Sequence, residues 1–201
     1  MAVTKERFGE GLTYEQYIDQ ITQNKERFLA NYENASIAPD AVEHFKKQSQ
    51  PLNLLAIGED WCGDVVAGFP VVAKLADASG GKLNLRVFLR DQNEDLINQY
   101  LNQGKFKSIP VFVFFDQNMR EIGHFIERPA AQTAETTQAR TEFFKAHSEY
   151  NVPEGADMSQ MSPEARQAWA GESQKLRTSR TAAWNKLLVD DLVKVTSGVP
   201  A

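Results

Sequence analysis

The only cysteine of the chain, Cys62, lies in the run Trp61-Cys62-Gly63-Asp64, directly after an apolar stretch and directly before a helix-like one. A thiolate is the nucleophile of thiol–disulfide exchange, and a helix N-terminus is a place where a thiolate is stabilised. Redox cysteines often occur as Cys-x-x-Cys pairs, but Val65 stands at the second position here. With one cysteine, no disulfide can form within the chain, so exchange through Cys62 would need a thiol from another molecule.

The residues around Cys62 predict a thiol of modest acidity. A helix N-terminus favours a nearby anion by about 0.3 to 1 kcal/mol. Three acids, Glu59, Asp60 and Asp64, oppose it, and one like charge at about 4 Å costs about 1 kcal/mol even in water. No lysine or arginine lies close by in the sequence, so we expect Cys62 to be less acidic than the nucleophile of a Cys-x-x-Cys protein. Asp64 suits a proton acceptor, although an acid in the first turn of a helix is already explained by the helix dipole.

The elements before Cys62 read as helices followed by a strand. Thr13 to Gln16 form a capping box, and apolar residues at helical spacing continue to Tyr32, which predicts one amphipathic helix. A short helix is expected over 39–47. The apolar run 52–57 then suits a buried strand.

The elements after Cys62 alternate between helix and strand. Apolar residues over 65–75 fit one helix face, and Pro70 lies inside that helix. A strand with alternating side chains is expected over 83–90, then a helix that Asn93 caps and Gly104 ends. Strands over 111–115 and 121–126 are joined by a turn. This order predicts an α/β sheet with helices on both faces and an antiparallel last pair.

The sequence predicts three segments. Residues 1–49 form an N-terminal helical extension and residues 50–127 form the core. From Arg128 the composition becomes rich in Ala, Gln, Thr, Glu and Arg, and residues 128–201 are expected to be helices packed on the same domain. Ser162-Pro163-Glu164 should begin a long final helix.

The core resembles the thioredoxin superfamily over roughly residues 50 to 127. Trp61-Cys62-Gly63 matches the start of that family's active site, and Pro70 matches the proline of its first core helix. Asp91-Gln92-Asn93 follows the second core strand as in the family, and Ser108-Ile109-Pro110 looks like its cis-proline loop. The resemblance implies a thioredoxin-like fold, a central mixed sheet of about four strands flanked by helices, with extra N- and C-terminal helices like those of bacterial thioredoxin-like proteins.

The resemblance also implies a site. Cys62 would be the catalytic residue, Trp61, Gly63 and Asp64 its active-site loop, and Ile109 and Pro110 the substrate-binding residues. Two positions depart from the family pattern. Val65 replaces the resolving cysteine, and Ala56 stands where thioredoxins carry a buried carboxylate.

Two hypotheses about function follow. The first is a monothiol thiol–disulfide oxidoreductase that uses Cys62 on a disulfide-containing protein or small molecule, with glutathione or another small thiol as co-substrate and no bound cofactor. The alternative is a thioredoxin-fold protein-binding module that has lost redox activity. A third, iron–sulfur assembly as in monothiol glutaredoxins, is disfavoured because the residues after Cys62 do not match that motif.

Composition excludes several other classes. The net charge of -5 and the absence of a basic stripe argue against nucleic acid or an anionic membrane as partner. The longest apolar runs, such as 111–115, are too short to cross a bilayer, and no signal peptide is recognisable at the N-terminus, so we expect a cytoplasmic protein. The three histidines, His44, His124 and His147, show no metal-ligand spacing. The oligomeric state is left open.

Overall fold

The computed structural model describes residues 3–156 and 158–198, which form two compact units. The sheet unit contains the described residues up to Arg128 and those from Asn185 onward, and the helical unit is Pro129–Trp184. The expectation that residues 128–201 pack on the same domain as the core stays a prediction. Of these residues, Arg128 and the end of the final helix belong to the sheet unit, in which Leu188, Val189 and Leu192 form a buried apolar face.

The sheet has four strands in the order β2-β1-β3-β4, which confirms the expected mixed sheet. β1 and β2 are parallel, whereas β3 is antiparallel to both β1 and β4. Ile57, near the end of β1, lies opposite Val111 at the start of β3, which lies opposite Ile126 at the end of β4. The loops that follow β1, β2 and β4 and the loop that precedes β3 therefore meet at one edge of the sheet. The strands are β1 (Leu52–Gly58), β2 (Leu83–Leu89), β3 (Val111–Phe115) and β4 (Glu121–Ile126).

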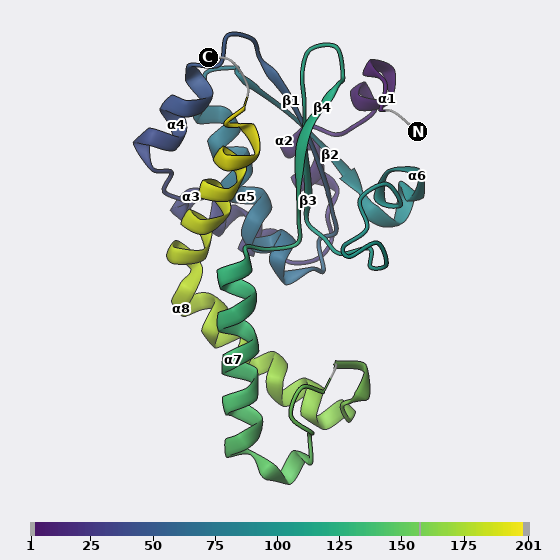
Figure 1. Cartoon of the computed structure of the whole chain (residues 1–201), viewed down its shortest axis with the longest axis vertical. Helices are drawn as coiled ribbons and strands as arrows, with labels where there is room; N and C mark the ends of the chain where they lie inside the picture. The colour runs from purple at the N-terminus through teal and green to yellow at the C-terminus, as the bar shows by residue number, and fades with distance from the viewer. Residues whose placement is uncertain (1–2, 157, 199–201) are drawn as a thin grey trace. The chain divides into compact units, whose positions relative to one another are not determined.

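Helices cover both faces of this sheet (Figure 1). On one face, Phe69 of α5 packs on Phe112 and Phe45 of α4 stacks on Phe114. On the other face, Arg7 of α1 lies over Phe88. The helices of the sheet unit are α1 (Lys5–Gly9), α2 (Tyr14–Gln20), α3 (Lys25–Asn34), α4 (Pro39–Lys46), α5 (Gly63–Ala78), η1 (Arg90–Gln92) and α6 (Glu94–Ile97).

The single N-terminal helix expected from Thr13 to Tyr32 is wrong, because the structure divides it into α2 and α3. The carboxylate of Asp60 accepts hydrogen bonds from the backbone N–H groups of Thr22 and Gln23, at 2.9 and 2.8 Å. These two amides are thereby satisfied outside any helix. The predicted capping box at Thr13 is present.

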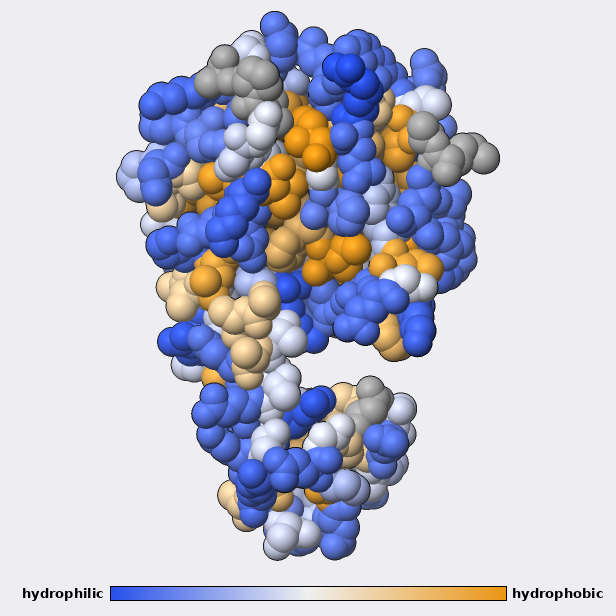
Figure 2. Space-filling view, in the orientation of Figure 1, coloured by the Kyte–Doolittle hydropathy of each residue, from blue (hydrophilic) through white to orange (hydrophobic). Residues whose placement is uncertain are grey.

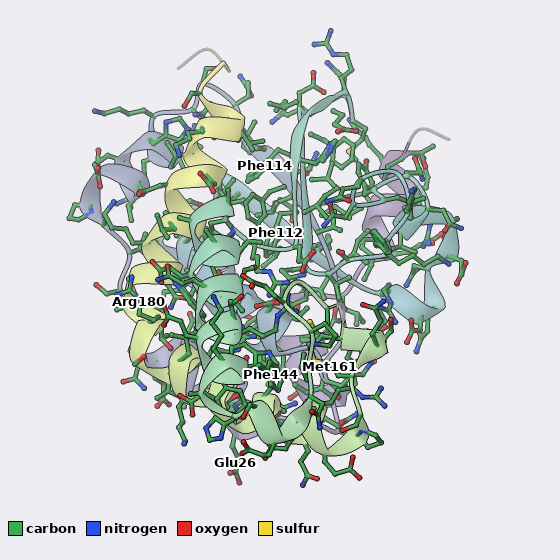
Figure 3. All side chains as sticks on the ribbon, turned by 60° about the horizontal axis from the view of Figure 1, so that its bottom comes forward. Glu26, Phe112, Phe114, Phe144, Met161 and Arg180 are labelled. Carbon is green, nitrogen blue, oxygen red and sulfur yellow. The ribbon has the colours of Figure 1, made fainter. Side chains whose placement is uncertain are left out.

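The core of the sheet unit lies between the sheet and α5. Phe69, Phe112 and Phe114 are almost or fully buried, and Figure 3 shows Phe112 and Phe114 side by side along β3. Mainly hydrophilic side chains cover the face drawn in Figure 2, with apolar ones showing between them over the sheet unit. No helix among the described residues is long and apolar enough to cross a membrane.

The helical unit has a small core of its own. Phe144, Met161, Ala165 and Trp169 are buried in it, and Figure 3 shows Phe144 near Met161. Glu135 accepts hydrogen bonds from Arg180 at 2.8 and 2.9 Å and from the Trp184 indole at 2.8 Å. The helices here are α7 (Ala130–Ala146), η2 (Ser148–Tyr150), η3 (Met158–Gln160) and the first part of α8 (Pro163–Thr196), whose predicted start is confirmed.

Candidate active site

Cys62 is the N-cap residue of α5 and follows β1 by a short loop. Its backbone is extended, its carbonyl accepts a hydrogen bond from the Val66 N–H at 2.9 Å, and its own N–H donates to the Glu59 carbonyl at 3.2 Å. The side chain is half-buried. The sulfur therefore lies at the N-terminal end of a 16-residue helix, where the N–H groups of the first turn and the helix dipole favour an anion.

The loop before β3 faces this cysteine. The Cys62 Sγ donates a hydrogen bond to the Ile109 carbonyl oxygen at 3.6 Å, and the Ile109–Pro110 peptide bond is cis. Both Ile109 and Pro110 are buried. The strand register explains why Cys62 lies beside Ile109, because the end of β1 and the start of β3 are antiparallel neighbours. The structure thus brings together Cys62, Ile109 and Pro110, as the sequence predicted.

Trp61 is exposed beside the cysteine, with 46% of its surface accessible. The Arg90 guanidinium lies 4.8 Å from the centre of the indole ring, a cation–π arrangement. Arg90 also pairs with Asp91 at 2.8 Å and donates to the Lys107 carbonyl at 3.5 Å. Arg90 therefore ties the indole to the loop that precedes β3.

Asp64, in the first turn of α5, forms an ion pair with Arg128. The Nη1 atom of Arg128 lies 3.4 Å from Oδ2 of Asp64, whose side chain is 13% exposed. Gly63 opens the same turn, and Val65 behind it is fully buried. The expectation that no cation lies near Cys62 is therefore wrong, since Arg90 and Arg128 both reach this site.

Sequence reasoning missed these two arginines because each is far from Cys62 along the chain. Arg90 directly follows β2, the parallel neighbour of β1, and Arg128 follows β4 by one residue. The strand order brings both to the edge of the sheet where Cys62 lies. The signal in the sequence was the position of each arginine at the end of a predicted strand or just after one, and it became usable only with the strand order known.

The two acids that precede Trp61 accept hydrogen bonds from backbone amides. The Glu59 carboxylate accepts a hydrogen bond from the Asp91 N–H at 2.8 Å, which joins the loops after β1 and β2. Asp60 holds the turn between α2 and α3. Burial raises the pKa of Glu59, more than the Asp91 hydrogen bond lowers it. Both carboxylates thus accept hydrogen bonds from backbone amides of neighbouring segments. Among the described residues, no group of three or more His, Cys, Asp or Glu side chains could hold a metal ion.

Replacing Glu59 with glutamine is expected to raise the free energy of unfolding at neutral pH. The raised pKa means that the folded state binds the proton more tightly than the unfolded chain, so the charged form opposes folding. Wild type should gain stability relative to the variant as the pH falls through the raised pKa of Glu59 in the folded state to the ordinary glutamate pKa of the unfolded chain. Urea unfolding at about pH 7 and about pH 4 measures both parts.

The control for this comparison is Glu43→Gln, at an exposed position on α4. It should change stability little at either pH. A loss of stability in Glu59→Gln at neutral pH would mean that the charged hydrogen bond to Asp91 outweighs the cost of burying the carboxylate.

The sheet and the loops at the edge where Cys62 lies, called the cysteine edge below, match a known family. A family model described as thioredoxin matches residues 11–140. The chain belongs to the thioredoxin family. Its four-stranded sheet flanked by helices is therefore a thioredoxin-like fold, as the sequence predicted.

Two solved structures resemble this thioredoxin-family chain over almost its whole length. One is a protein of unknown function from Pseudomonas aeruginosa, with a TM-score of 0.66, 15% identity and coverage of 100% of both chains. The other is described as an HIV epitope-scaffold, with a TM-score of 0.61, 15% identity and coverage of 98% of this chain and 99% of that one. At such identity the likeness concerns the fold alone. No curated protein sequence matches the chain.

Proposed function

We propose that this protein carries out monothiol thiol–disulfide exchange through Cys62. The observation that carries the proposal is the position of the sulfur, half-buried at the N-terminal end of α5 and 3.6 Å from the Ile109 carbonyl. The same edge of the sheet presents exposed Trp61 beside the sulfur. These features supply a nucleophile, a stabilising helix end and an adjoining surface for a substrate.

The reaction has two balanced steps. The Cys62 thiolate attacks one sulfur of an external disulfide, so a mixed disulfide forms and the other sulfur leaves as a thiolate. A second, external thiolate then attacks the mixed disulfide, which regenerates Cys62 and leaves the second half of the substrate in a new disulfide. Glutathione is the kind of small thiol that fits this role, and a reducing compartment such as the cytoplasm would supply it.

Incubation with oxidised glutathione tests the proposal directly. Wild-type protein should gain one disulfide-linked glutathione at Cys62, which reduced glutathione then removes. Cys62→Ser should gain none. Intact-mass and peptide mass spectrometry measure the adduct. A short unstructured peptide with one cysteine provides the reference rate.

The alternative is a protein-binding module without redox activity, and two buried residues favour it. Val65 and Ala56 are both apolar and inaccessible, and Ala56 lies opposite Phe112 in the sheet, so these two positions supply neither a second thiol nor a carboxylate to Cys62. If Cys62 forms no adduct under conditions that modify the reference peptide, the exchange proposal fails and the binding module is favoured. Partners trapped by wild type but not by Cys62→Ser in a lysate would identify disulfide substrates.

A further inference from the structure

The ion pair between Asp64 and Arg128 distinguishes the electrostatics of this site from what its acid-rich sequence suggests. Asp64 lies two residues after Cys62 in the same first turn of α5. Its side chain is 13% exposed and that of Arg128 is 26% exposed, so water screens their charges less than at a free surface. The Nε atom of Arg128 is buried with no acceptor among the described residues. One edge of the guanidinium is therefore removed from solvent while the other faces Asp64.

The position of Arg128 is fixed by the end of β4. The N–H of Glu127 donates to the Pro110 carbonyl at 2.7 Å, and Glu127 itself has a left-handed backbone with φ 68°. Its side chain accepts a hydrogen bond from Asn102 at 2.8 Å and another from Arg128. Arg128 is thus held between two carboxylates, Glu127 on its own segment and Asp64 on α5.

Charged and titratable groups reach the surroundings of Cys62 from several elements. They are Tyr17 of α2, Glu59 and Asp60 of the loop after β1, Asp64 of α5, Arg90 and Asp91 of η1, and Glu127 and Arg128 after β4. Glu59 and Asp60 accept hydrogen bonds from backbone amides. Arg90 is paired with Asp91. Arg128 is paired with Asp64, the acid in the first turn of the cysteine's own helix.

We propose that Arg128 controls the ionisation of Cys62 by neutralising Asp64 in the first turn of α5. With the pair intact, the helix N-terminus acts on the thiolate with little opposition from Asp64. Without the guanidinium, the Asp64 carboxylate, two residues from Cys62 in the same turn of α5, loses the positive charge of this pair. Arg128 is thus a positioning residue that acts through Asp64. Its meaning for catalysis rests on the exchange function proposed above, but its effect on ionisation does not.

The titration of Cys62 tests this proposal in the full-length protein. The rate of alkylation by iodoacetamide against pH gives the midpoint for wild type and for each variant. Arg128→Met should raise the midpoint by roughly half a pH unit to one pH unit, from one added like charge at short range. Arg128→Lys should recover part of that change, and Asp64→Asn should lower the midpoint.

The double variant Arg128→Met with Asp64→Asn distinguishes coupling from a general loss of charge. The effect of removing Arg128 should be smaller when Asp64 is already neutral. Arg120→Met is the matched control. It also removes one arginine from an arginine–aspartate pair, but its side chain is 79% exposed and lies at the turn between β3 and β4, away from the cysteine edge. It should leave the midpoint of Cys62 unchanged.

Two outcomes would overturn the proposal: an Arg128→Met midpoint equal to that of Arg120→Met, or an undiminished effect of Arg128→Met in the Asp64→Asn background. If Arg128→Met fails to fold, as judged by circular dichroism, Asp64→Asn decides the question, because a midpoint equal to that of wild type would then overturn the proposal. A failure of the exchange function is distinguishable, because Cys62 would then titrate as described while forming no adduct with oxidised glutathione.

Discussion

Phe112→Ala is expected to lower the free energy of unfolding of the sheet unit by about 3 to 5 kcal/mol. Phe112 is fully buried in β3, and its ring lies 5.7 Å from that of Phe69 and 6.4 Å from that of Phe125. Its removal leaves a cavity between the sheet and α5 that a rigid strand and helix close only partly. The loss is a large fraction of the free energy of unfolding of a typical domain, which is about 5 to 15 kcal/mol.

Urea unfolding followed by circular dichroism measures this loss. Because the chain has two compact units, the transition that carries the sheet is the one that should move. Phe106→Ala is the matched control, since the same side chain is removed at a position that is 58% exposed, and we expect a change within about 0.5 kcal/mol. Equal losses for the two variants would contradict the assignment of Phe112 to the centre of the core.

The strands and the site loop were predictable because local signals there agree with the tertiary structure. The apolar run 52–57, the alternation over 83–90 and the proline before 111–115 each correspond to a strand within about one or two residues. The helix expected between Asn93 and Gly104 is shorter than predicted. α6 has only four residues, although Leu96, Ile97 and Tyr100 are all buried. Burial pattern was thus a better guide to the core than to the length of the helix.

Contacts between distant segments were the part that the sequence could not provide. The break between α2 and α3 depends on Asp60, which is 38 residues from Thr22. Arg128 reaches Asp64 only because β4 ends beside the start of β3. The neighbouring acids suggested an electronegative site, whereas two of them are bound by backbone amides and the third is paired. The sequence therefore showed which acids lie near Cys62 but not the groups that bind them.

Val65→Cys is expected to convert the site from one that keeps a mixed disulfide to one that resolves it. Cys62 is the N-cap of α5 and Val65 is at the third helical position. An N-cap side chain normally reaches the backbone N–H of that position, so side chains at the two sites lie on the same side of the first turn. After the Cys62 thiolate has taken up one half of oxidised glutathione, the introduced thiolate can attack the Cys62 sulfur and release reduced glutathione. An intramolecular disulfide remains.

The expected fraction of protein carrying glutathione falls by about tenfold or more, because an intramolecular thiol acts at high effective concentration. Mass spectrometry should show the loss of two hydrogens in place of the adduct. Val65→Ser is the control: its side chain is similar in size to that of cysteine but has no thiol, so the adduct should persist. Val65 is fully buried, and in Val65→Cys losing part of its apolar volume costs about 1 kcal/mol, which leaves the fold intact. Val65→Ser also buries a hydroxyl, at a further cost of about 1 to 3 kcal/mol, so its folding is checked by circular dichroism. A persistent adduct in Val65→Cys would mean that the buried side of α5 keeps the introduced thiol from reaching Cys62. The absence of a resolving cysteine would then be only one of the obstacles to a dithiol cycle on this scaffold.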